Sequence, residues 1–112
     1  MTKHFSRSEF SCKCCGKSKA SNELLAVLEL VRSHFGEPVV ITSGYRCPEY
    51  NKAAGGAPNS KHLLGVAADI HVENTDSSKV YKFLNDIFPD VYGIGSYSDW
   101  THIDVRKKKA RW

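Results

Sequence analysis

The segment from Ser60 to Val72 places an aspartate inside an otherwise apolar run. It reads Ser-Lys-His-Leu-Leu-Gly-Val-Ala-Ala-Asp and continues with Ile-His-Val, so His62 lies in a loop and Asp69 on a strand predicted over 66–72. A charge in so apolar a neighbourhood is costly unless it is paired or bound to a metal. We therefore expect the Asp69 carboxylate to have a partner elsewhere in the chain.

Helical and extended patterns alternate along the chain. Apolar residues recur at three- or four-residue spacing over 21–35 and again after Asp76, which predicts two helices buried on one side. Shorter patterns predict strands over 38–42, 66–72, 91–97 and 100–105, and a short helix over 49–54. The short Ser98-Asp99 link predicts that the last two strands form an antiparallel hairpin. The fold class is therefore α+β, with a small, mostly antiparallel sheet.

The size and composition are those of one compact domain over residues 1–112. Of the 112 residues, 41% are hydrophobic and 25% charged. This composition excludes a disordered or fibrous chain. No apolar run is long enough for a membrane helix, and the first residues lack the apolar stretch of a secretory signal. We expect a monomer, cytoplasmic as synthesised, that does not insert into a membrane.

The net charge of +4 is concentrated in the tail over 106–112. A basic tail can bind nucleic acid or a polyanionic surface such as a bacterial wall, and it can equally be a solvated, fraying terminus. The sequence contains no recognisable element that reads nucleic acid. We therefore do not expect a nucleic-acid partner.

Three of the four cysteines are crowded as Cys12-Lys13-Cys14-Cys15 in the N-terminal segment over 1–20, and Cys47 stands alone. The cluster could bind a structural zinc with Cys47 as the fourth ligand. A Cys12–Cys47 disulfide and simple packing are the competing interpretations. No cysteine lies beside a histidine in the manner of a nucleophile, so a structural role is expected.

His102 follows Asp69 by 33 positions on a second predicted strand. Together with His62, these residues offer two imidazoles and one carboxylate, a ligand set that suits zinc and leaves one tetrahedral position open for water. Their formal charge of −1 would leave the ion Lewis-acidic. The alternative is that the histidines are ordinary surface residues.

Four ordered motifs resemble a known family. They are Ser43-Gly44-Tyr45-Arg46, Tyr50-Asn51, Ser60-x-His62-x-x-Gly65-x-Ala67-x-Asp69 and His102-x-Asp104. Together they are similar to the zinc D-Ala-D-Ala carboxypeptidases, a family that includes phage and bacterial peptidoglycan endopeptidases and shares its metal fold with the hedgehog signalling domain. The resemblance covers about 10–112. It implies Zn²⁺ as the cofactor, bound by His62, Asp69 and His102, and a small sheet with helices packed on one side.

The resemblance also implies which residues contact substrate. Arg46 would approach the scissile carbonyl or a substrate carboxylate, and Ser60 would hydrogen-bond substrate near the metal. Tyr45, in the same motif as Arg46, is a further candidate for substrate binding. The alternatives are a structural ion pair for Arg46 and a capping hydroxyl for Ser60.

The general base has two candidates. Lytic members of the family carry an acid three positions before the last histidine, and Asp99 occupies that position here. Residues three apart on a regular strand face opposite sides, so Asp99 reaches the site only if the chain turns or bulges before His102. Asp104 is the alternative base, or a group that supports the ligands. His71, two past Asp69, would either close the site as a fourth ligand or support it from outside.

The function implied is zinc-dependent hydrolysis of peptidoglycan stem peptides, as a D-Ala-D-Ala carboxypeptidase or an endopeptidase. Such a domain suits a phage or prophage lysis enzyme that reaches the bacterial cell wall after holin-type release. The alternative is a non-catalytic, zinc-dependent binding domain of the same fold.

Overall fold

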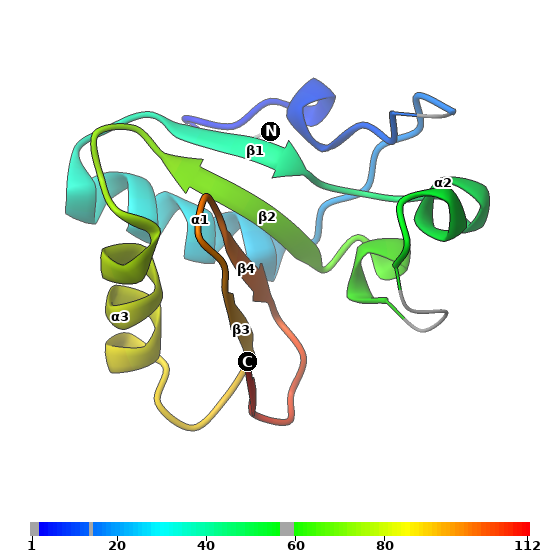
Figure 1. Ribbon diagram of the computed structural model, residues 1–112. Coiled ribbons are helices and arrows are strands. Elements are labelled where there is room, and N and C mark those ends of the chain that lie inside the picture. The colour runs from blue at the N-terminus through cyan, green and yellow to red at the C-terminus, as the bar shows by residue number, and fades with distance from the viewer. Residues whose placement is uncertain (1–2, 14, 57–59) are drawn as a thin grey trace.

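The computed structural model describes residues 3–13, 15–56 and 60–112 of the chain (Figure 1). In chain order the elements are η1 (Arg7–Phe10), α1 (Asn22–Phe35), β1 (Val39–Ser43), α2 (Pro48–Ala53), η2 (Lys61–Leu64), β2 (Ala67–Val72), α3 (Ser77–Ile87), β3 (Gly93–Ser96), β4 (Thr101–Asp104) and β5 (Ala110–Arg111). No helix in these ranges is both long and apolar enough to cross a membrane.

The five strands form one sheet in the order β1-β2-β4-β3-β5. The first four pair antiparallel with their neighbours, and β5 runs parallel to β3. The α+β class with a mostly antiparallel sheet is therefore confirmed. The predicted hairpin is formed by β3 and β4.

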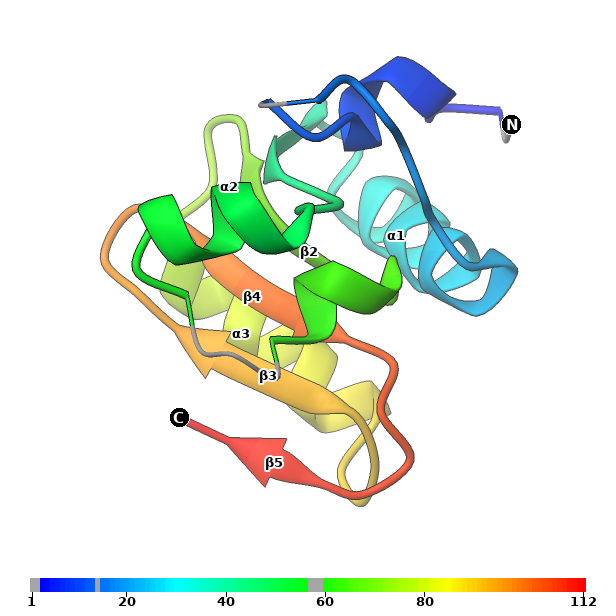
Figure 2. The same ribbon diagram turned by 90° about the vertical axis from the view of Figure 1, so that its right-hand side faces the viewer.

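One face of the sheet packs on α1 and α3, and this layer contains the core (Figure 2). The hydroxyl of Ser21 caps α1 by accepting a hydrogen bond from the Leu24 amide at 3.1 Å, and Gly36 ends the helix in the left-handed conformation at φ 66°. Alternate residues of the strands contribute to this core, because side chains on a strand point to opposite faces in turn. The fully buried members include Leu24, Leu25, Leu28, Val31, Ile70, Val72, Val80, Leu84, Ile94 and Ile103.

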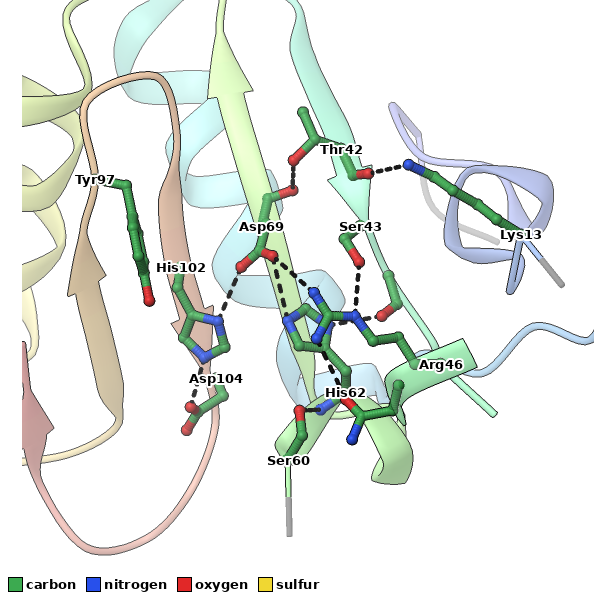
Figure 3. Close-up of polar contacts among 12 residues, drawn as sticks. Lys13, Thr42, Ser43, Arg46, Ser60, His62, Asp69, Tyr97, His102 and Asp104 are labelled. Carbon is green, nitrogen blue, oxygen red and sulfur yellow. Dashed lines mark hydrogen bonds and ion pairs between the residues drawn. The ribbon is translucent and has the colours of Figure 1, made fainter. Parts of the chain in front are cut away.

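The other face of the sheet carries the short helices α2 and η2 (Figure 2). His62 lies on η2, where a loop was predicted. The Ser60 hydroxyl accepts a hydrogen bond from the His62 amide at 3.2 Å and so begins this single turn. The strand residues between the core positions, Asp69 and His102 among them, point to this side (Figure 3).

The C-terminal tail pairs with the sheet through Ala110 and Arg111, so the end of the chain does not fray, although the lysines at 107–109 are exposed to solvent. The Ala110 amide donates to the Tyr92 carbonyl at 3.0 Å, and the Ser96 amide donates to the Trp112 carbonyl at 2.7 Å. The guanidinium group of Arg111 donates to the Phe88 carbonyl at 2.6 Å and to the Tyr92 carbonyl at 2.7 Å. This basic residue therefore anchors the tail by hydrogen bonds to backbone carbonyls.

Candidate metal centre

The register of the sheet brings Asp69 and His102 together. The two residues are directly opposite each other in the antiparallel pair β2–β4. On the other side of β2, Ser43 pairs with Asp69 beyond an irregularity that follows Ile41. The chain after β1 therefore passes close to the same carboxylate, and η2 adds His62 from the front (Figure 3).

The donor atoms of His62, Asp69 and His102 all lie within 4.8 Å of one another. Nε2 of His62 is 3.4 Å from Oδ2 of Asp69, and Nδ1 of His102 is 2.9 Å from Oδ1 of the same carboxylate. All three residues are buried, with at most 8% of their surface exposed. The sequence prediction that these three residues converge therefore agrees with the structure.

A hydrogen bond at Nδ1 of His62 determines which of the two ring nitrogens faces the site. Nδ1 lies 2.7 Å from the carbonyl oxygen of Gly44, which can only accept a hydrogen bond. Nδ1 therefore carries the proton, and the lone pair of Nε2 points towards Asp69 (Figure 3). A hydrogen bond of this kind orients a metal-binding imidazole and raises its basicity.

His102 is oriented in the opposite sense by Asp104. Its Nε2 atom is 2.8 Å from Oδ2 of Asp104, which leaves Nδ1 as the atom that faces the site. Asp104 is fully buried and also accepts two hydrogen bonds from the guanidinium group of Arg106, at 2.7 Å each. Both of its oxygens are therefore already engaged, which suits a positioning role and not that of a general base.

The charges of this cluster stabilise one another. Burial alone would raise the pKa of Asp69, but its close contacts with the imidazoles of His102 and His62 outweigh burial and hold that pKa well below its ordinary value. Burial likewise opposes ionisation of Asp104, and its contacts with His102 and Arg106 lower its pKa well below the usual range. Burial lowers the pKa of His102, whereas Asp104 and Asp69 raise it, with a net increase. The site thus keeps two carboxylates ionised next to an imidazole.

This donor set fits a zinc ion. Two imidazole nitrogens and one carboxylate oxygen are typical of catalytic zinc sites, where a fourth position stays open to water or substrate. The hydrogen bonds of His62 and His102 leave one lone pair of each ring available to a metal. His62, Asp69 and His102 would hold the ion, and Asp104 and Gly44 would hold the two imidazoles.

The three donors open into a pocket of about 480 Å³. Three basic residues line it, namely Arg46, Lys61 and Arg106. Of the lining residues in the described ranges, only Asp69 is acidic. A zinc ion would add positive charge, so the pocket suits a substrate that carries a carboxylate.

Arg46 is held in place before any substrate arrives. Its Nε donates to the Ser43 hydroxyl at 3.2 Å, and Nη1 donates to the Asn51 side-chain oxygen at 3.3 Å. Nη2 lies 3.5 Å from Oδ2 of Asp69 (Figure 3). The structure thus combines the two interpretations of Arg46, because it is part of an ion pair and also lines the pocket.

An aromatic wall of Tyr97, Trp100 and Trp112, which no sequence pattern predicted, completes the pocket. The rings of Tyr97 and Trp100 stack with their centroids 4.5 Å apart, and the Trp112 ring lies 5.0 Å from that of His102. Trp112 approaches the backbone of Gly95 so closely that a Cβ atom there would lie 2.5 Å from its Nε1. Gly95 and Trp112 are far apart in the sequence and form no pattern there, so only the sheet pairing of the tail shows that they meet.

Asp99 and His71 lie in a second hollow, away from the three donors. This hollow, of about 490 Å³, lies beside the β3–β4 hairpin and shares Tyr97 with the pocket of the metal centre. Asp99 is exposed at the hairpin tip and does not line the pocket around His102. His71 is also exposed, and the converging ligand group among the described residues does not include it.

The two remaining candidates occupy different surroundings. Ser60 lines the pocket and also caps η2, so both interpretations of its hydroxyl agree with its position. Tyr45 is buried, and the Lys19 ammonium lies 5.1 Å from its ring centroid. Tyr45 is not among the residues that line the pocket, so the structure places it in the packing beside the N-terminal segment.

Three converging donor groups beside an open pocket, on a small α+β domain, are the arrangement of a catalytic zinc site such as those of zinc hydrolases. The chain belongs to the Peptidase M15 family, whose model matches residues 3–104. This confirms the resemblance seen in the sequence, because the family is of the zinc D-Ala-D-Ala carboxypeptidase type. The protein is therefore a metallopeptidase of a zinc-dependent family. A comparison with curated proteins gave no match.

Proposed function

We propose that the protein hydrolyses a peptide bond in peptidoglycan stem peptides, with zinc held by His62, Asp69 and His102. The observation that carries this proposal is the convergence of the three donors at the floor of a basic pocket, with both imidazoles oriented by hydrogen bonds to Gly44 and Asp104. Bound zinc would supply the Lewis acidity that peptide hydrolysis requires.

Arg46 is the residue that orients the substrate. Its guanidinium group is fixed by Ser43 and Asn51, and Nη2 points to the same carboxylate that holds the metal. A substrate carbonyl or carboxylate next to the metal can accept a hydrogen bond from Nη2. Because the group is already positioned, little conformational entropy is lost when substrate binds.

Asp99 is the proposed proton acceptor, on the strength of its place three residues before His102. Asp69 is a metal ligand, and the oxygens of Asp104 are occupied by His102 and Arg106. Asp99 lies on the other side of Tyr97, so it acts only if substrate draws the link between β3 and β4 towards the pocket. A base must come within hydrogen-bond distance of the water that it deprotonates.

The charge of the pocket supports a stem peptide as the substrate. Stem peptides carry free carboxylates, and Arg46, Lys61 and Arg106 line the pocket. The bond that is cut would be the terminal D-Ala-D-Ala bond or an internal one. Action on the wall, as a phage or prophage lysis enzyme, is part of the same proposal.

The test is digestion of purified peptidoglycan by the zinc-loaded protein, with products identified by mass spectrometry. We expect release of D-alanine if the terminal bond is cut, and of longer peptides if an internal bond is cut. His62→Ala should bind no zinc at this centre and release neither. If the zinc-loaded wild-type protein releases no product, the proposal is wrong.

One observation favours a second function, a zinc-dependent binding domain without hydrolysis. Among the described residues that line the pocket, no carboxylate other than Asp69 is present to accept a proton. This alternative predicts that the zinc-loaded protein binds stem peptides, measured by calorimetry, without altering them. Saturable binding together with an unchanged mass spectrum would decide in its favour.

A further inference from the structure

The thiols of Cys12, Cys15 and Cys47 form a second converging group outside the pocket. Their sulfur atoms all lie within 4.8 Å of one another, although Cys47 follows Cys12 by 35 positions. No disulfide joins any two of the described cysteines. Cys14 lies outside the described residues. The group therefore has the composition of a metal site, and it shares no residue with the centre of His62, Asp69 and His102.

The backbone around the first two cysteines forms a tight loop. The Gly16 amide donates to the Cys12 carbonyl at 2.9 Å, and the Cys12 amide donates to the Lys17 carbonyl at 2.7 Å. Gly16 has a φ of 75°, which favours glycine because a Cβ atom is strained there. Two cysteines separated by two residues, followed by such a turn, have the spacing of ligand pairs in structural zinc sites.

The third thiol comes from the segment that carries Arg46. The Cys47 amide lies 3.4 Å from Sγ of Cys12, and the Tyr50 amide lies 3.4 Å from Sγ of Cys47. Both amides donate to sulfur, so the positions of the Cys12 and Cys47 side chains are fixed by the backbone of the segment that follows Arg46. The two sulfur atoms are therefore held beside that of Cys15, as a shared metal ion requires.

We propose that Cys12, Cys15 and Cys47 hold a second, structural zinc ion. A Zn–S distance of about 2.3 Å places tetrahedral thiolates about 3.8 Å apart, a separation compatible with three sulfur atoms that all lie within 4.8 Å of one another. A disulfide needs only two sulfurs at about 2.05 Å and leaves the third without a role. The fourth position belongs to a ligand outside these three.

The ion would join the N-terminal segment to the chain that positions Arg46. The same two segments already meet through the Tyr45 amide, which donates to the Phe10 carbonyl at 3.0 Å, and through Nζ of Lys13, which donates to the Thr42 carbonyl at 2.9 Å. A metal that bridges Cys12 and Cys47 would hold these contacts against thermal motion. The inference does not depend on hydrolysis of any substrate.

The test is elemental analysis of the full chain, purified under reducing conditions without chelators. We expect two zinc ions per chain for the wild-type protein, one for His62→Ala and one for Cys15→Ser. Cys15 is exposed, so its replacement by serine disturbs packing least. Lys13→Ala, in the same loop, is the matched control and should keep both ions.

Cobalt distinguishes the thiolate site from the histidine site. Cobalt-loaded His62→Ala should show the near-ultraviolet charge-transfer absorption of cobalt thiolates, and adding Cys15→Ser should abolish it while the circular dichroism of the fold is retained. Cys47→Ser should give the same loss. The inference is overturned if His62→Ala retains no metal, if Cys15→Ser keeps both ions, or if the reduced wild-type protein shows no cobalt-thiolate absorption.

Discussion

Nε2 of His102 lies 2.8 Å from Oδ2 of Asp104, on the opposite side of the imidazole ring from the metal centre. This contact fixes the ring so that Nδ1, and not Nε2, faces the open pocket. Asp104 is itself held by Arg106 and is fully buried. The acid two residues after the last histidine therefore acts on the metal through the ligand that it orients.

Asp104→Asn should weaken zinc binding at the histidine centre. Loss of a partner that orients a metal ligand typically costs about 10- to 100-fold in affinity. The variant also leaves the half-buried Arg106 without its ion-pair partner, so its free energy of unfolding should fall. Competition with a chromophoric chelator, carried out on Cys15→Ser chains so that only this centre is read, measures the affinity. An unchanged zinc affinity would contradict the positioning role.

Arg46→Lys should impair substrate binding and leave the metal in place. Lysine keeps the charge but cannot donate to Ser43, Asn51 and a substrate at the same time. Loss of one charge-assisted hydrogen bond corresponds to a fall of about 10- to 100-fold in kcat/KM. Arg32→Lys, in the last turn of α1, is the matched control and should behave as the wild-type protein does. Loss of zinc in Arg46→Lys would instead assign Arg46 to the integrity of the metal centre.

Trp112→Ala should raise KM without loss of zinc. The ring lies 5.0 Å from that of His102, and its Nε1 donates to the Tyr97 hydroxyl at 2.9 Å. An aromatic contact of this kind contributes about 0.5–1.5 kcal/mol, or roughly a 2- to 10-fold change in KM. Trp112→Phe keeps a ring but loses the hydrogen bond, so its KM should lie between those of the wild-type protein and Trp112→Ala. Equal KM values for all three proteins would exclude Trp112 from substrate contact.

Much of the fold could be predicted because it depends on local patterns. The periodicity over 21–35, the cap at Ser21 and the stop at Gly36 specify α1 to within a residue. The β-branched run after Pro38 likewise predicts β1. The tail could not be predicted in this way. Its two-residue strand has no periodicity, and the half-buried Arg111 is anchored by carbonyls that only the assembled sheet brings together.

The candidate site was likewise predictable in part from the sequence. His62, Asp69 and His102 could be predicted because their motifs resemble those of a known family and occur in the same order along the chain. The sheet register then places Asp69 and His102 opposite each other. The position of the Asp99 side chain could not be predicted, because Asp99 lies in the link before β4, where side-chain direction depends on the conformation of the turn. The Tyr97–Trp100 stack fixes that turn, and stacking across a link is not visible as a pattern.

Tyr92→Phe should reduce stability most at neutral pH. The Tyr92 hydroxyl donates to Oε2 of Glu23 at 2.7 Å, and burial together with this carboxylate raises the pKa of Tyr92 to about 12. A raised pKa means that the fold favours the protonated phenol. Its contribution is therefore complete below pH 10 and is lost as the pH rises towards 12. The difference in unfolding free energy between the wild-type and Phe proteins should shrink over this window, as measured by urea denaturation.

Glu23→Gln is the control for the loss of stability between pH 10 and pH 12. It removes the negative charge that opposes ionisation of Tyr92, so the loss of stability should begin at a lower pH than in the wild-type protein. A difference between wild-type and Tyr92→Phe that stays constant from pH 10 to pH 12 would contradict the assignment of the raised pKa to this pair.

Asp99→Asn should separate hydrolysis from metal binding. If Asp99 accepts the proton, the substitution should lower kcat by about 10²- to 10⁴-fold, the usual contribution of a general base. Zinc content should not change, because Asp99 lies in the hollow beyond Tyr97 and touches none of the three ligands. Asp90→Asn removes an exposed acid outside both hollows and should leave kcat unchanged.

The pH profile gives a second measurement on the same variant. A general base acts only when ionised, so the acid limb of kcat in the wild-type protein should report its titration and should be missing from the residual activity of Asp99→Asn. If Asp99→Asn keeps both the wild-type kcat and the acid limb, the proton passes to another group. The link between β3 and β4 would then serve only to carry Tyr97 and Trp100 to the pocket wall.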